Sequence, residues 1–171
     1  MTALDRFNGL PPAEAEAELL ACCASGRWVT GMAAGRPYPD AATLRLMGAA
    51  ELHRLGWDGV LEALAAHPRI GERVAGEDRE SAWSRQEQSG MDRAAAGLRD
   101  ALVEGNLAYE ARFGHVYLVC ATGLSAEEML DRLHSRLRNT PDAERDVVRA
   151  ELGRIVALRL TRLAAGDGGA A

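Results

Sequence analysis

The sequence contains no lysine, so all 20 of its basic residues are arginine. Without lysine the chain can form no pyridoxal Schiff base, has no lysine nucleophile and lacks the phosphate-binding lysine of a P-loop. A GC-rich genome is the simplest cause of this replacement. Whatever its cause, the absence excludes three kinds of catalytic machinery.

Cysteine is also scarce. Cys22, Cys23 and Cys120 are odd in number and do not have the spacing of a metal site. Cys22 and Cys23 are adjacent, so on a helix they point in different directions. We expect them to be small buried hydrophobic residues in a reducing compartment.

No apolar run approaches the roughly 20 residues of a membrane span. Neither end of the sequence carries a recognisable targeting signal. The net charge of −5 also argues against nucleic acid as a partner, because nucleic-acid binding usually needs a basic face. We therefore expect a cytoplasmic protein with no membrane or nucleic-acid partner.

The 171 residues are 47% hydrophobic, which suffices for one domain with a sizeable core. Alanine and leucine dominate, and the long segments repeat at helical rather than strand period. We predict a single compact all-α domain over residues 1–165, a flexible tail at 166–171 and one short extended segment near residues 115–122.

Helix boundaries are marked by a few local signals. Pro11-Pro12 predicts the start of a helix that Gly26 ends, and Asp40 is a good N-cap. His67-Pro68 ends a helix that begins at Trp57. Other helices are predicted around Trp28 and Met32, over residues 80–88, from an Asp92 cap to Phe113 before Gly114, from the Ser125 capping box to Leu137, and from Thr140-Pro141 to Ala165.

Three clusters could carry chemistry. The first is His67-Pro68-Arg69-Ile70-Gly71, in which we expect the helix end to place the histidine at a surface. Histidine has the side chain best suited to proton transfer at neutral pH. Taken alone, however, such a histidine is more often a cap or a solvated residue.

The second cluster is Ser84, Glu87 and Gln88, whose i, i+3, i+4 spacing places them on one helix face. They could recognise a small polar molecule, although polar runs more often form a solvated face. The third is Arg159 among apolar residues of the last helix. Its guanidinium could bind a carboxylate bidentately in a pocket, although arginine more commonly extends to water.

In order along the chain, four motifs resemble those of the OHCU decarboxylase family. The family acts on 2-oxo-4-hydroxy-4-carboxy-5-ureidoimidazoline (OHCU) in urate breakdown. The resemblance extends from about Phe7 to Leu163. The motifs are His67-Pro68-Arg69-Ile70-Gly71, Ser84-x-x-Glu87-Gln88, Asn106-x-x-Tyr109-x-x-Arg112-Phe113-Gly114 and Leu158-Arg159-Leu160.

The resemblance implies a compact helical fold that converts OHCU to carbon dioxide and (S)-allantoin without metal or organic cofactor. OHCU can receive the electrons of the broken bond in its own ring imine. The protein then has to hold the carboxylate, manage the C4 hydroxyl proton and protonate one face of C5. The resemblance also suggests a homodimer.

By the same resemblance, His67 is the general acid/base, Glu87 is the active-site carboxylate and Arg159 grips a carboxylate or ureido oxygen. Pro68, Ser84 and Gln88 line the pocket. The backbone of an extended piece also contacts substrate, and unpaired N–H and C=O groups there would suit a flat ureide. That piece consists of Tyr117, Leu118, Val119, Cys120 and Ala121.

A non-catalytic ureide-binding or regulatory module of the same fold is the alternative, although the intact set of His67, Glu87 and Arg159 speaks against it. A hydrolase with Ser84 as nucleophile is disfavoured, because Ser84 is not in a Gly-x-Ser-x-Gly turn.

Overall fold

The computed structural model describes residues 1–72, 76, 78–91, 94 and 96–166. These residues form helices and irregular connections and contain no strand, which confirms the all-α prediction. The chain divides into two compact units, Leu64–Leu152 and the remainder on either side of it, and the boundaries fall within α5 and α9. The predicted flexible tail at 166–171 lies, apart from Gly166, outside the described residues.

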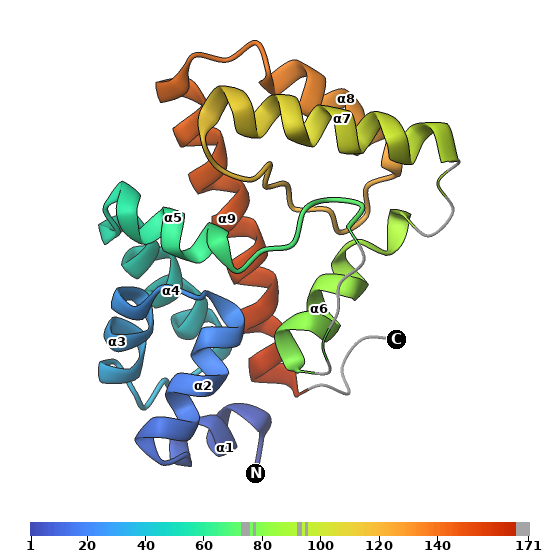
Figure 1. Cartoon of the computed structure of the whole chain (residues 1–171). Coiled ribbons are helices and arrows are strands. Elements are labelled where there is room, and N and C mark those ends of the chain that lie inside the picture. Colours follow the sequence, from blue (N-terminus) through green and yellow to red (C-terminus); the bar gives the residue numbers. More distant parts are fainter. Residues whose placement is uncertain (73–75, 77, 92–93, 95, 167–171) are drawn as a thin grey trace. The chain divides into compact units, whose positions relative to one another are not determined.

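The first unit is built mainly from the N-terminal helices (Figure 1). Within it α2 packs against α3, and α3 packs against α4. Its largest buried side chain is that of Trp28, whose indole N–H donates to the carbonyl of Gly48 at 3.0 Å. The helices of this unit are α1 (Ala3–Gly9), α2 (Pro12–Cys22), α3 (Gly26–Ala34), α4 (Ala41–Arg54), most of α5 (Trp57–Ala65) and the C-terminal part of α9 (Pro141–Ala165).

Two N-terminal boundaries differ from the predictions. Helix α1, which precedes Pro11, was not predicted, although Thr2 and Asp5 form a capping box at its start. Gly26 does not end the preceding helix. That helix stops when Cys23 adopts an extended conformation, and Gly26 instead begins α3. Cys22 and Cys23 are both fully buried, as expected.

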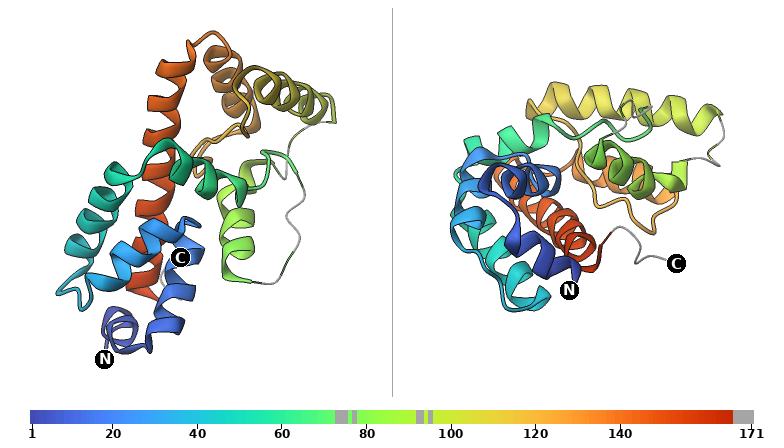
Figure 2. Two further views of the ribbon diagram at one scale, coloured as in Figure 1. Left: turned by 60° about the vertical axis from the view of Figure 1, so that its left-hand side comes forward. Right: turned by 90° about the horizontal axis from the view of Figure 1, so that it is seen from below.

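In the second unit, α7 and α8 lie side by side and enclose much of the core (Figures 1 and 2). A Cβ atom added to Gly105 of α7 would lie 2.8 Å from the Leu133 side chain of α8, so glycine permits this close packing. The unit's helices are α6 (Arg79–Glu87), the 3₁₀ turn η1 (Ser89–Met91), α7 (Ala96–Phe113), α8 (Ala126–Arg136) and the N-terminal part of α9.

Several local signals in this unit have the predicted effect. Gly114 ends α7 with a φ of +77°, a conformation that favours glycine. Ser125 and Glu128 form the predicted capping box of α8. Residues 114–125, which contain the predicted extended segment, form a non-helical connector between α7 and α8. The predicted Asp92 cap lies outside the described residues, and α7 begins at Ala96.

Candidate functional site

His67 follows the last turn of α5, where its backbone N–H donates to the carbonyl of Leu64 at 2.9 Å. Pro68 then prevents the helix from continuing. The prediction that His67 lies at a surface is wrong, because the residue is only 9% exposed. The physical reason is that the chain after Pro68 packs into the second unit, where Ile70 is buried, so the imidazole faces a hollow of that unit rather than bulk solvent.

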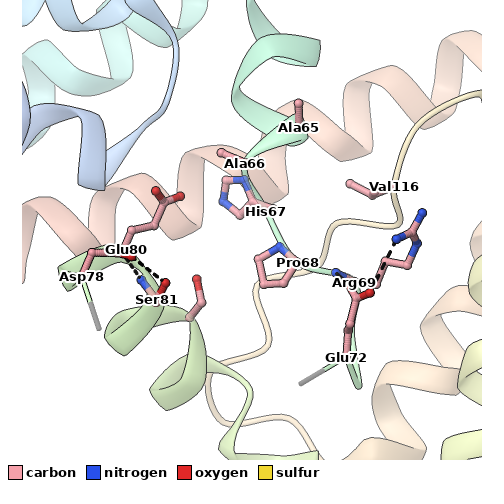
Figure 3. A pocket seen from close by; sticks show the side chains of 11 residues that line it. Ala65, Ala66, His67, Pro68, Arg69, Glu72, Asp78, Glu80, Ser81 and Val116 are labelled. Atoms are coloured by element: carbon pink, nitrogen blue, oxygen red, sulfur yellow. Dashed lines mark hydrogen bonds and ion pairs between the residues drawn. The ribbon is translucent and has the colours of Figure 1, made fainter. Parts of the chain in front are cut away.

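That hollow is a cavity of about 580 Å³ within the second unit. In Figure 3, His67 from the end of α5 and Glu80 from α6 both extend into this space. Its volume is in the range of small-ligand sites. The lining residues are Ala65, Ala66, His67, Pro68, Arg69, Glu72, Asp78, Glu80, Ser81, Ser84 and Val116.

The loop after His67 is held by side chains of α7. The Asn106 side-chain amide donates to the carbonyl of Ile70 at 2.9 Å. The Arg69 guanidinium forms two bonds to the Glu110 carboxylate, at 2.5 and 3.0 Å. The hydrogen bond that Arg69 donates to Glu110 raises the pKa of Arg69. These contacts fix the chain immediately beyond the catalytic candidate.

Helix α6 supplies a second wall of the cavity. Its N-cap is Asp78, whose side chain accepts a hydrogen bond from the Ser81 N–H at 2.9 Å. Ser84 is 3% exposed and lines the cavity. Ser84 also lies inside the helix, as expected from its lack of a nucleophile-elbow motif.

Glu87, one turn further along α6, is 8% exposed and is not among the described residues that line the cavity. Gln88 is the C-cap residue, and its side-chain oxygen accepts a hydrogen bond from the Gly71 N–H at 3.1 Å. The interpretation of Ser84, Glu87 and Gln88 as a solvated face is therefore wrong, because Ser84 and Glu87 are buried and Gln88 is half-buried.

The predicted substrate-contacting segment lies in the connector between α7 and α8. Tyr117, Leu118, Val119 and Ala121 are buried, and Cys120 is half-buried. Val116, rather than these residues, lines the cavity. The expectation that the backbone of this segment is unpaired is wrong at two positions: the carbonyl of Leu118 accepts from Arg136 at 2.6 Å, and the N–H of Cys120 donates to Glu151 at 2.7 Å.

Behind this connector lies a buried polar cluster that the sequence analysis did not identify. The Glu144 carboxylate accepts hydrogen bonds from Tyr109, from Arg136 at 2.8 Å and from Asn139 at 2.7 Å. The Arg136 guanidinium also lies 4.8 Å from the ring centre of Tyr117. Only Tyr109 belongs to a quoted motif, and no local spacing connects it with Glu144.

Burial governs the ionisation of this cluster. Burial raises the pKa values of Tyr109 and Tyr117, so both phenols stay protonated. Burial alone would lower the pKa of Arg136, but the hydrogen bond to Glu144 and the electrostatic interactions with Tyr109, Glu144 and Tyr117 together outweigh it, so the pKa is raised. The guanidinium therefore remains a cation among neutral phenols and one carboxylate.

Arg159 belongs to the first unit and is fully buried. Its Nη1 atom donates to the carbonyl of Ala21 at 3.1 Å. The alternative that this arginine extends to water is therefore wrong, because the side chain is fully buried. Its predicted role in binding an oxygen of the substrate stays a prediction.

Among the residues that the structure describes, no three His, Cys, Asp or Glu side chains cluster as metal ligands would. The same described part of the chain contains no helix that is both long and apolar enough to span a membrane.

Comparison with known proteins gives consistent matches. The family model described as OHCU decarboxylase matches residues 8–161. A 2-oxo-4-hydroxy-4-carboxy-5-ureidoimidazoline decarboxylase from Amia calva is 31% identical over 74% of this chain and 73% of its own length. The uric acid degradation bifunctional protein TTL of Arabidopsis thaliana is 27% identical over 86% of this chain, which spans 47% of that protein.

A solved structure is similar along nearly its whole length. It is a crystal structure of OHCU decarboxylase in the presence of (S)-allantoin, with a TM-score of 0.77 and 25% identity. The match covers 87% of this chain and 98% of the other.

Proposed function

The chain belongs to the OHCU decarboxylase family, and from this membership we propose that it converts OHCU to (S)-allantoin and carbon dioxide in urate catabolism. The observation that carries the proposal is that His67, in a motif within the matched residues 8–161, lines a cavity of small-ligand size. The alternative, a non-catalytic ureide-binding module, would bind product or substrate without turnover.

His67 is the proposed general acid/base. In the reaction the bond from C4 to the carboxylate breaks, and carbon dioxide leaves. The electron pair enters the neighbouring ring imine, whose nitrogen takes up a proton. The C4 hydroxyl then loses its proton as C4 becomes a carbonyl, and a proton is delivered to C5. His67 would supply or relay that proton, which requires an imidazole held at the cavity wall. The hydrogen bonds that hold the loop beyond Pro68 support this role, because they limit movement of the imidazole.

Glu87 is the proposed active-site carboxylate, and Arg159 is proposed to grip a carboxylate or ureido oxygen. The carboxylate of Glu87 would orient His67 or a substrate N–H and repel the departing carboxylate. Arg159 supplies the two parallel donors that a carboxylate needs for bidentate binding.

Pro68, Ser84 and Gln88 are proposed to contact substrate, together with the backbone of residues 117–121. Ser84 offers a hydroxyl at the cavity wall. The side-chain oxygen of Gln88 holds Gly71, so we expect its NH₂ group to face substrate. The carboxylates of Asp78 and Glu80 add acceptors suited to a ligand rich in N–H groups.

The chemistry uses no cofactor in this proposal, since the substrate contains its own electron sink. We also propose that residues 1–165 act as one domain and that the protein is a cytoplasmic homodimer. Light scattering after size-exclusion chromatography tests the dimer, and limited proteolysis tests the single domain.

The experiment that tests the activity uses OHCU generated freshly from urate. OHCU decays unaided to racemic allantoin, so circular dichroism separates enzymatic from spontaneous product. We expect an optically active product whose rate of formation is proportional to protein concentration. Racemic product at the spontaneous rate would favour the non-catalytic module.

A further inference from the structure

We propose that Arg136 and Glu151 are positioning residues that together fix the backbone of Leu118–Cys120 for substrate binding. The inference rests on the proposed function, because it concerns the segment that is proposed to contact OHCU. It goes beyond that function in assigning roles to two charged residues that lie outside all four quoted motifs.

The two side chains bond to the peptide groups on either side of Val119. The Arg136 Nη1 donates to the carbonyl of Leu118 at 2.6 Å, and the Glu151 Oε2 accepts from the N–H of Cys120 at 2.7 Å. Both bonds are charge-assisted, which makes them stronger than bonds between neutral groups. Arg136 comes from the end of α8 and Glu151 from α9, so two helices hold one short piece of connector.

Val119 lies between these two fixed points and is 3% exposed. Neither its N–H nor its C=O forms a hydrogen bond with another residue in the described part of the chain. Buried backbone groups are nearly always bonded to something. The backbone of Val119 therefore offers one donor and one acceptor, held in place by its neighbours, which match the alternating N–H and C=O groups of a ureide.

The two side chains are themselves held in place. Arg136 is 7% exposed and Glu151 is 5% exposed. Glu144 bonds to the Arg136 guanidinium through Nε at 2.8 Å and Nη2 at 2.7 Å. The guanidinium lies over the ring of Tyr117 on the connector itself. Because both side chains are already held, they lose little conformational entropy when a ligand binds. Pre-organisation of this kind improves affinity.

Buried charged groups can also serve stability alone, so the test needs a measurement that separates the two roles. A purely structural role would change the unfolding midpoint and the amount of active enzyme, which lowers apparent kcat. If the two residues position a backbone that binds substrate equally well in the ground and transition states, their replacement raises KM and leaves kcat nearly unchanged.

The decisive comparison is Glu151→Met against Glu151→Gln, assayed in the full-length protein with freshly generated OHCU. Methionine keeps the length but cannot accept the Cys120 N–H well, so we expect KM to rise about tenfold. Glutamine keeps an acceptor oxygen, so we expect KM to rise less than about threefold. Asp146→Asn, an exposed acidic residue on the same helix, is the matched control and should leave both constants unchanged.

Arg136→Lys is the second variant, and it tests the positioning role on its own if Glu151→Met does not fold. Lysine keeps a positive charge for Glu144, but it lacks the fork that reaches Glu144 and the carbonyl of Leu118 together. We expect KM to rise about tenfold with little change in kcat. Arg138→Lys is its control, since Arg138 is exposed and bonds to the carbonyl of His134, four residues earlier in the chain.

The possible outcomes are distinguishable. An active wild type whose KM is unchanged in both Glu151→Met and Arg136→Lys would overturn the positioning role and leave the proposed function intact. A fall in kcat that follows the loss of folded protein, at constant KM, would also overturn it. A folded wild type that does not convert OHCU would overturn the proposed function, and the positioning role with it.

Discussion

The side-chain oxygen of Gln88 accepts a hydrogen bond from the backbone N–H of Gly71 at 3.1 Å, so the end of α6 is attached to the loop that follows His67. Gln88 is also the C-cap residue of that helix. One residue therefore couples the helix that contains Ser84 and Glu87 to the loop that follows the catalytic candidate, His67. This bond contributes to the relative placement of these groups.

Replacement of Gln88 tests the bond directly. Gln88→Met should lower the free energy of unfolding by about 1–2 kcal/mol, because the Gly71 N–H loses its partner in a half-buried place. Gln88→Glu keeps an acceptor oxygen and should cost less. Urea titration of both variants measures the difference, and equal losses would show that the acceptor atom is not what matters.

His67→Asn should leave the fold intact and lower the rate by about 10²–10⁴, the usual contribution of positioned acid–base catalysis. Asparagine can replace the hydrogen bonding of the imidazole but not its proton transfer near neutral pH. The rate of (S)-allantoin formation and the unfolding midpoint should be measured on the same preparation. A folded variant with most of its activity would contradict the assignment.

Glu87→Gln preserves the shape of a side chain that is 8% exposed and removes its charge. If the carboxylate acts through its charge, the loss should appear mainly in kcat. Glu104→Gln on α7 is the control, since Glu104 is exposed and belongs to no quoted motif. An unchanged kcat in Glu87→Gln would show that Glu87 serves packing rather than chemistry.

The sequence predicted those features that depend on neighbouring residues. Asp40 caps α4 and Ser125 caps α8, because a capping side chain bonds to an N–H three residues away. Gly26 was assigned wrongly because glycine is compatible with both the end and the start of a helix. The start of α1 could have been found from Thr2 and Asp5, which have the spacing of a capping box.

The site was only partly predictable for a different reason. His67, Ser84 and Gln88 were found because they lie in short motifs, but the burial of His67 depends on where the following loop packs. The bond between Tyr109 and Glu144 joins residues 35 positions apart. Nothing in the spacing of either residue indicates that contact, because it exists only once the connector and three helices have packed.

Asp78 predicts a dependence of stability on acid. Its carboxylate accepts hydrogen bonds from the Ser81 backbone and hydroxyl, and the backbone bond lowers its pKa below the ordinary value of 3.8. A lowered folded-state pKa stabilises the protein at pH values above 3.8, and this stabilisation is lost as the pH falls through the folded-state pKa. Asp78→Ala should therefore be less stable than wild type at neutral pH, with the difference shrinking in acid.

Thermal unfolding from neutral pH down to about pH 3 measures this dependence. Asp100→Ala is the control, since Asp100 is exposed and lies within α7, in its second turn. A difference between Asp78→Ala and wild type that stays constant across the whole pH range would show that the carboxylate charge does not contribute.

The final helix offers the sharpest test of the predicted substrate grip. Arg159 is fully buried, whereas Arg162, one turn further along α9, is partly exposed and lies outside the quoted motif. Arg159→Lys keeps the charge but loses the two parallel donors that bind a carboxylate or ureido oxygen. KM should rise by roughly tenfold or more. If Arg159 binds the substrate equally strongly in the ground state and the transition state, KM should change by a larger factor than kcat.

Arg162→Lys is the matched control for this change and should be nearly silent. Because Arg159 also donates to the carbonyl of Ala21, the unfolding midpoint of both variants should be measured beside the kinetic constants. A lower midpoint with unchanged KM would assign Arg159 to the packing of α9 against α2 rather than to substrate. A damaging Arg162→Lys beside a harmless Arg159→Lys would mean that the substrate-facing position of α9 lies one turn later, at Arg162.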